Sequence, residues 1–300
     1  MLTQYSKFVF LLAVSVLCLA AATPAKIIVV ASIPDLGSIA STIGGDNVSV
    51  SSITKADANP HSVEVFPSYM AKVSRATLYL KGGLALDQWA DAIIDGSRNN
   101  HLVVVDCSKD VRVLDKPSGK VDASQGDVHP EGNPHYWLNP ENGIVIAQNI
   151  LAGLQKADPS QSAVYVSNFE RFKTDCASKI AVWKQALKPM AGRNILEYHS
   201  SWVYFATAFG LNIVGHVEPF PGIPPTGKHL AELVSIIKKE NVAFIIQEPY
   251  FPGDAPKFLN RQTGIPVLKL APACQGVDAN DYFAHFDAIV SAILKTQGGK

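Results

Sequence analysis

The stretch that decides the fold is residues 158–189, DPSQSAVYVSNFERFKTDCASKIAVWKQALKP. Asp158 suits a helix N-cap, Pro159 suits the first helical position, and Pro189 ends the pattern. Apolar residues between them recur at steps of three and four, at Val166, Phe169, Phe172, Cys176, Ile180, Trp183 and Leu187. About thirty residues at ~1.5 Å each predict a rod of roughly 45 Å, which is long enough to cross a domain. Because the apolar face runs its full length, we expect this helix to pack on two lobes and to allow little hinge motion.

Short β-branched runs alternate with helical patterns on both sides of this helix. The expected strands are 27–32, 48–53, 77–80 and 101–106 in the first half and 194–198, 212–217, 242–247 and 266–270 in the second. The expected helices between and after them are 36–43, 67–74, 85–94, 202–209, 229–240, 256–263 and 281–294. Such alternation is typical of βαβ units. We therefore predict an α/β protein of two lobes, each with a mostly parallel four-stranded sheet flanked by helices, joined by one long rigid helix. The expected boundaries are 26–157, 158–189 and 190–300.

Residues 1–25 have the features of a secretory signal peptide: a polar start with Lys7, an apolar run over 8–22 and then small residues. Leu17 precedes Cys18 where a lipobox has Gly or Ala, so we expect no lipid anchor. No second long apolar stretch follows, which favours a soluble periplasmic protein. Export permits disulfides, but the spacing of the three remaining cysteines matches no metal motif, and whether two of them pair stays open. These are Cys107, Cys176 and Cys274.

The charge balance gives no sign of nucleic-acid binding, because Lys+Arg and Asp+Glu both number 26. The chain has eight histidines, and two of them stand behind the same rigid dipeptide, at Asn59-Pro60-His61 and Asn133-Pro134-His135. His199 ends a predicted strand. All three lie beyond carboxyl ends of strands, where open α/β sheets bind ligands. The pattern alone leaves open whether they share a metal site or are solvated loop residues. His101, His216, His229 and His285 are better explained as structural or exposed.

Three motifs carry a resemblance to a known family: Asn59-Pro60-His61-x-x-Glu64 with Pro67-Ser68, NPHYWLNP at 133–140, and His199-Ser200-x-x-x-Tyr204-Phe205 before Gly210-Leu211. The chain is similar to the periplasmic zinc- and manganese-binding solute-binding proteins of ABC importers (cluster A-I, or cluster 9). The likeness extends over the mature chain. It implies one metal ion held between two rigid lobes by His61, His135 and His199, delivery to an inner-membrane ABC permease, and no enzymatic activity.

The chain departs from this family at the fourth ligand. Ala271 and Ala273 stand where a carboxylate is expected after the last strand. The alternatives are Glu64, as a ligand or as a partner for a ligand's second ring nitrogen, then Glu248, Asp278, the Cys274 thiolate, or water. The resemblance also makes 109–134 a metal-capture loop. That loop holds only one histidine, so its capture candidates are Asp127, His129 and Glu131.

Three histidines without an assured carboxylate favour zinc over manganese as the transported ion, since manganese prefers oxygen ligands. We therefore expect a monomeric zinc-binding importer subunit, with an exported metallochaperone as a further partner besides the permease. The alternatives are a manganese-binding subunit and a secreted zinc hydrolase. The hydrolase would also use three histidines and an open position, but no His-Glu-x-x-His helix is present. A third reading is a cleft for a non-metal solute.

Overall fold

The N-terminal half forms a fully parallel four-stranded sheet with strand order β2-β1-β3-β4. The structure is a computed structural model that describes residues 25–119 and 129–296. The strands of this sheet are β1 (Ile27–Ala31), β2 (Val48–Ser52), β3 (Leu78–Lys81) and β4 (Val103–Asp106). The helices of this half are α1 (Pro34–Gly44), α2 (Pro67–Val73), α3 (Trp89–Ser97) and α4 (Pro140–Ala157).

The C-terminal half repeats this architecture with the order β6-β5-β7-β8, again all parallel. Its strands are β5 (Asn194–Glu197), β6 (Asn212–His216), β7 (Ile245–Gln247) and β8 (Val267–Lys269). Its helices are α6 (Val203–Phe209), α7 (Gly227–Lys239), α8 (Asp254–Thr263) and α9 (Asp281–Lys295). The predicted two-lobe α/β fold is therefore confirmed.

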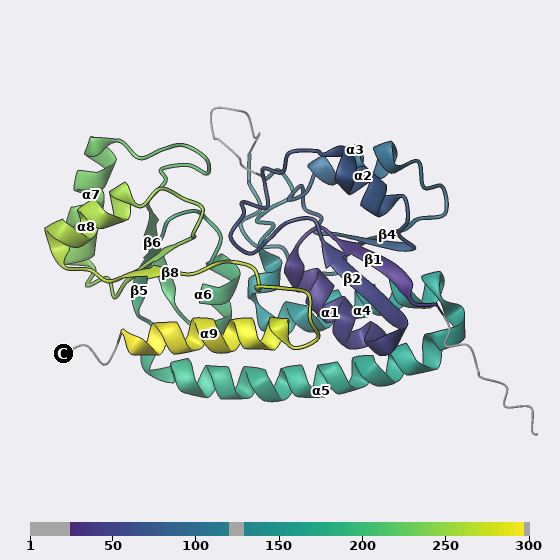
Figure 1. The fold of residues 1–300 in the computed structure, drawn as a ribbon. Coiled ribbons are helices and arrows are strands. Elements are labelled where there is room, and N and C mark those ends of the chain that lie inside the picture. The colour runs from purple at the N-terminus through teal and green to yellow at the C-terminus, as the bar shows by residue number, and fades with distance from the viewer. Residues whose placement is uncertain (1–24, 120–128, 297–300) are drawn as a thin grey trace, which may run out of the picture.

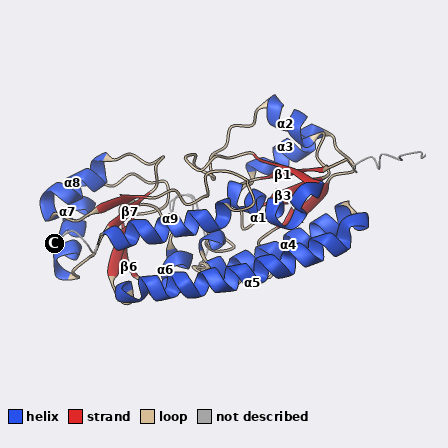
Figure 2. Ribbon diagram, turned by 60° about the horizontal axis from the view of Figure 1, so that its bottom comes forward, coloured by secondary structure: helices blue, strands red, loops and turns tan. Residues whose placement is uncertain are grey.

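The predicted long helix is α5 (Ser162–Leu187), preceded by a 3-10 turn at Pro159–Gln161 and followed by another at Lys188–Met190. It runs beneath both lobes, with α9 beside it (Figures 1 and 2). Asp158 does not cap it: the Asp158 carboxylate accepts hydrogen bonds from the hydroxyls of Ser160 and Tyr165 instead of backbone N–H groups.

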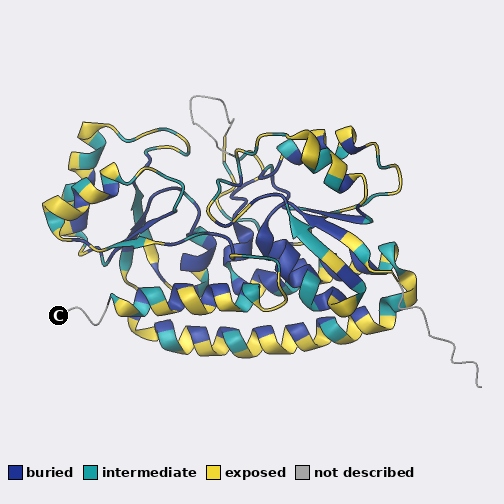
Figure 3. Ribbon diagram, in the orientation of Figure 1, coloured by how far each residue is buried: buried dark blue, intermediate teal, exposed yellow. Residues whose placement is uncertain are grey.

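The prediction of the apolar face of α5 is wrong at one residue. Val166 is exposed, whereas Tyr165 is fully buried and begins the face that continues through Phe169. Both residues are compatible with a step to Phe169, of three or of four, so spacing alone could not choose between them. Figure 3 shows the resulting division of α5 into a buried face toward the lobes and an exposed face.

The two lobes share a large hydrophobic core, and each lobe has a smaller apolar cluster of its own. A single cluster of buried side chains contains Leu36 of α1, Ile150 of α4, Trp183 of α5, Phe205 of α6 and Phe286 of α9. Each large apolar side chain buried in this way contributes about 1.5–3 kcal/mol. Separating the lobes would expose this cluster, so the shared core makes the connection stiff. The C-terminal helix α9 belongs to this base, because it lies against both α5 and α1.

Two predicted boundaries in the first lobe are wrong. The strand expected from His101 begins at Val103, and the helix expected from 85 begins at Trp89. Residues 84 and 85 have positive φ angles of 49° and 59°, which a helix does not allow. The buried carboxylate of Asp87 accepts hydrogen bonds from the backbone N–H groups of Gly82 and Gly83, and this holds the segment in turns.

Two further features concern the whole described chain. Cys107, Cys176 and Cys274 are buried and free, as small core residues. Across 25–119 and 129–296, no helix is both long enough and apolar enough to span a membrane. The expected signal peptide and Cys18 lie outside the described residues.

Candidate metal centre

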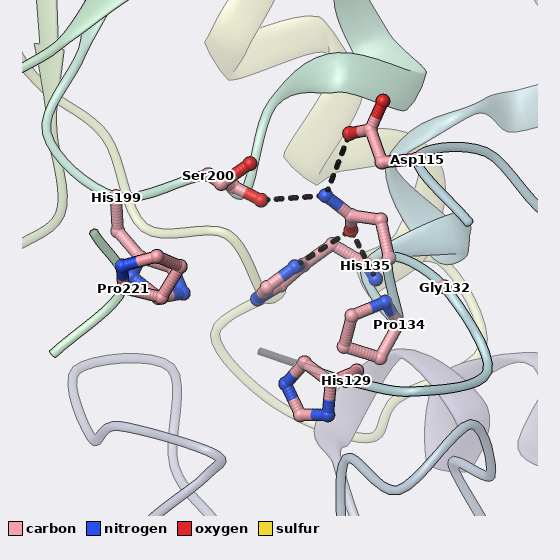
Figure 4. A pocket seen from close by; sticks show the side chains of 9 residues that line it. Asp115, His129, Gly132, Pro134, His135, His199, Ser200 and Pro221 are labelled. Atoms are coloured by element: carbon pink, nitrogen blue, oxygen red, sulfur yellow. Dashed lines mark hydrogen bonds between the residues drawn. The ribbon is translucent and has the colours of Figure 1, made fainter. Parts of the chain in front are cut away.

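A cavity of about 160 Å³ lies between the lobes, beyond the carboxyl ends of the strands (Figure 4). Its walls come from the segment before α4 and from the segments that follow β5 and β6. The residues lining it are Asp115, His129, Gly132, Asn133, Pro134, His135, His199, Ser200 and Pro221.

The structure brings together His61, His135 and His199. One ring nitrogen from each lies within 4.8 Å of the others. The Nε2 atoms of His61 and His135 are 2.9 Å apart, and the ring centroids of His135 and His199 are 5.5 Å apart. In a tetrahedral zinc site with ~2.0–2.1 Å bonds, ligand nitrogens lie roughly 3.3 Å from one another. Small side-chain adjustments would therefore bring all three nitrogens onto one ion.

Asn133 fixes the direction of the His135 ring. The Asn133 Oδ1 atom accepts hydrogen bonds from the His135 backbone N–H and from the ring Nδ1, both at 3.0 Å. The Asn133 side-chain amide donates across the cleft to the Ser200 carbonyl at 2.7 Å. Because Nδ1 carries the proton, the lone pair of Nε2 faces the cavity.

The first Asn-Pro-His motif repeats only part of this arrangement. Asn59 Oδ1 accepts the His61 backbone N–H at 3.0 Å, but His61 Nδ1 has no hydrogen-bond partner among the described residues. The dipeptide thus shapes the same backbone turn twice, and it orients the ring only in the second copy.

His199 pairs with a carboxylate that the sequence analysis missed. Its Nδ1 lies 2.9 Å from Glu218 Oε2, and both side chains are buried. Glu218 Oε2 also accepts the backbone N–H of Gly222, which holds it in place. A carboxylate behind a ligand histidine orients the ring and raises its basicity. The signal was available, because Glu218 stands just past the end of a predicted strand.

The three rings differ in their proton affinity. Burial lowers the pKa of His61 and of His135 well below 6.5, and the neighbouring histidines add to this effect. For His199, burial acts in the same direction, but the hydrogen bond to Glu218 and the charges of Glu248 and Glu197 outweigh it and raise the pKa. At neutral pH, His61 and His135 are therefore neutral and ready to bind a cation.

A second histidine–carboxylate pair lies in the same lobe. His216 Nδ1 is 3.0 Å from Glu197 Oε1, without hydrogen-bond geometry, while Glu197 Oε2 accepts the backbone N–H of Trp202. His216 lies at the end of β6 and does not belong to the group of three.

The other sequence candidates lie at different places. Glu64 and Glu131 are exposed, and Asp127 lies outside the described residues. Asp278 is exposed, and its backbone carbonyl accepts the hydroxyl of Ser38 on α1. None of the described carboxylates joins the group of three histidine nitrogens.

Glu248 and Cys274 are the buried candidates for a fourth ligand. Glu248 Oε1 accepts a hydrogen bond from the Trp202 indole, and burial raises its carboxyl pKa to about 7. The Cys274 thiol donates to the Gly276 carbonyl, and burial raises its pKa, so it is protonated at neutral pH. A protonated thiol is a poor metal ligand. His129 lines the cavity, with its ring centroid 5.0 Å from that of His61.

Comparison with known proteins identifies the family. The family described as zinc-uptake complex component A, periplasmic (ZnuA), matches residues 29–296, and the chain belongs to it. The manganese ABC transporter substrate-binding lipoprotein PsaA of Streptococcus mitis is 26% identical over 276 residues, covering 88% of this chain and 86% of that protein. The zinc-binding lipoprotein AdcA of Streptococcus pneumoniae (strain ATCC BAA-255 / R6) is 22% identical over 233 residues, covering 77% of this chain but only 46% of AdcA. A solved structure, "Crystal structure of ZnuA", superposes with a TM-score of 0.78 at 24% identity, covering 90% of this chain and 98% of that one.

These findings establish the general activity. The chain belongs to the metal-binding solute-binding components of ABC importers, which are not enzymes, and this implies a membrane permease as partner. The hydrolase alternative is therefore wrong. The relatives are named lipoproteins, so they give no support to the expectation that this chain lacks a lipid anchor.

Proposed function

We propose that this chain binds zinc through His61, His135 and His199 and delivers it to its permease from the extracytoplasmic side. The observation that carries the proposal is the group of three imidazole nitrogens within 4.8 Å at a cavity between the lobes, with no described carboxylate in the group. Imidazole is a preferred ligand of zinc, whereas manganese prefers carboxylate, carbonyl and water oxygens.

The hydrogen-bond partners of two of these histidines support the same assignment. Asn133 accepts the Nδ1 proton of His135, and Glu218 accepts that of His199. In each case Nε2 is left as the metal-binding atom, and the negative charge of Glu218 compensates part of the charge of a divalent cation in the buried site. Manganese is the alternative, since one of the relatives is named for it. The domain boundaries given above, a monomeric state and transfer from an exported metallochaperone are part of the proposal.

The decisive experiment is a competition titration of the purified mature protein with zinc and, separately, with manganese. We expect one zinc ion per chain, bound more tightly than manganese. His135→Ala should lower zinc affinity by more than the ~10–100-fold lost when only an outer partner of a ligand is removed. His101→Ala is the matched control, because His101 is an exposed histidine outside the cavity. Equal zinc affinity in His135→Ala and His101→Ala would refute the site, and tighter manganese binding would refute the choice of metal.

A further inference from the structure

His129 begins an ordered turn at the wall of the cavity. Its carbonyl accepts the backbone N–H of Gly132 at 3.1 Å, which closes a four-residue turn. Gly132 has a φ of +114°, and a Cβ there would lie 2.9 Å from the Leu114 carbonyl oxygen, so only glycine fits. The next residue, Asn133, donates its backbone N–H to the Leu114 carbonyl at 2.9 Å. His129 is therefore tied to the segment that positions His135.

The His129 ring already lies among the other histidines. Its centroid is 5.0 Å from that of His61, which is almost the distance of 4.9 Å between the rings of His61 and His135. Figure 4 shows His129, His135 and His199 on different sides of the same cavity. Three of its walls thus carry an imidazole, and the His61 ring lies next to all three.

The remaining candidates for a fourth ligand are less suitable. The residues after β8 offer Ala271 and Ala273, which have no donor atom, and a protonated Cys274. Glu248 is held by the Trp202 indole, and it is not in the group of ligand atoms. A zinc ion held by three protein ligands keeps an open position for water or substrate, whereas four ligands close the site. A closed site suits a carrier, because a carrier holds its ion and catalyses no reaction at it.

We propose that His129 is the fourth zinc ligand, so that the ion is held by four imidazoles. The inference rests on the proposed site at His61, His135 and His199. The His129 nitrogens are not in the group within 4.8 Å, so coordination requires the His129 ring, which is already near His61, to approach the rings of His135 and His199. A site made only of neutral nitrogen donors favours zinc over manganese, because manganese then gains none of the oxygen ligands that it prefers. His129 is thus a specificity-determining residue and not a member of a capture loop.

The test compares His129→Ala with His101→Ala in zinc and manganese titrations. We expect His129→Ala to lower zinc affinity by at least about 10–100-fold, to lower manganese affinity by a smaller factor, and to leave the stoichiometry at one zinc per chain. Unchanged zinc affinity in His129→Ala, with affinity lost in His135→Ala, overturns the fourth ligand and leaves the proposed function standing. Loss of zinc affinity in neither variant overturns both. A second zinc ion that disappears in His129→Ala, while the first binds as before, also overturns the inference, since His129 would then serve a separate site.

A spectroscopic test reports coordination directly. In His129→Cys, a thiolate bound to Co²⁺ should produce a sulfur-to-cobalt charge-transfer absorption with one equivalent of cobalt. The matched control His101→Cys and the wild-type protein, whose described cysteines are buried and protonated, should not show this absorption. Its absence from His129→Cys, when that variant still binds one cobalt ion, would exclude position 129 from the site.

Discussion

Asp35 joins the two lobes through a buried carboxyl group, and its substitution has a calculable effect on stability. It lies in the first turn of α1 and is fully buried. Its Oδ2 accepts the backbone N–H of Cys274, from the segment after β8, at 3.2 Å, whereas Oδ1 has no partner among the described residues. Burial raises the carboxyl pKa from 3.8 to about 7, and the hydrogen bonds from Cys274 offset only part of this shift.

The direction in which stability changes with pH follows from the difference between the Asp35 pKa in the folded and in the unfolded chain. The unfolded chain releases the Asp35 proton near pH 3.8, and the folded protein holds it until about pH 7. Between these values the folded state binds more protons, so stability falls as the pH rises and reaches its full loss above about pH 7. A difference of about three pKa units corresponds to about 4 kcal/mol, which is an upper bound for this group.

Asp35→Asn removes the titrating group and keeps an oxygen for the Cys274 N–H. We expect the variant to become more stable relative to wild type as the pH rises from about 4 to about 8, by up to about 4 kcal/mol. Urea unfolding of the metal-free proteins at several pH values measures this difference, in which the contributions of the other groups cancel. Asp46→Asn, at an exposed aspartate, is the control. A difference between Asp35→Asn and wild type that stays constant across this range would refute the reasoning.

Three further predictions concern the cleft and the shared core. Glu218→Gln should weaken zinc binding at pH 8 by about 10–100-fold. It should also move the acid-induced loss of binding to lower pH, because it removes the partner that raises the His199 pKa. Competition titrations across pH test both effects. Trp137→Phe should cost about 1 kcal/mol in urea unfolding, since the indole donates to the Pro272 carbonyl across the lobes at 2.6 Å. Trp183→Ala should cost about 3–5 kcal/mol by the same assay, because it leaves a cavity in the shared core, whereas Val182→Ala, at a largely exposed neighbour, should cost far less.

The sequence predicted the elements well, because both signals it uses are local. Strand–helix alternation found all eight strands of the described chain, and the spacing of apolar residues found α5. Asn139 is the cap of α4, because its side chain accepts the Glu141 N–H at 2.9 Å. Errors occurred where hydrogen bonds from backbone N–H groups to a side chain decide the backbone, as at Asp87, or where two spacings are equally compatible, as at Tyr165 and Val166.

The site was predictable to the extent that topology places strand ends together. His61 and His135 follow strands of the first sheet and His199 follows a strand of the second, and carboxyl ends of parallel strands are where such sheets bind ligands. Glu218 was missed because its importance comes from pairing with His199, which lies 19 residues earlier in the chain. His129 was assigned to a polar loop because its hydrogen-bonded turn and its neighbour His61 are visible only in three dimensions.

The shared core also determines how the protein responds to its cargo. Because one cluster of apolar side chains runs through α1, α4, α5, α6 and α9, the largest core of the protein belongs to both lobes together. Ligand binding adds about 2.7 kcal/mol to the stability of a folded state at a hundredfold excess over Kd. That increment would be felt by both sheets at once, so heating should give one cooperative transition that moves upward as a unit with zinc concentration. Zinc binding therefore stabilises the whole chain against unfolding, although the ion contacts only a few residues in the cleft.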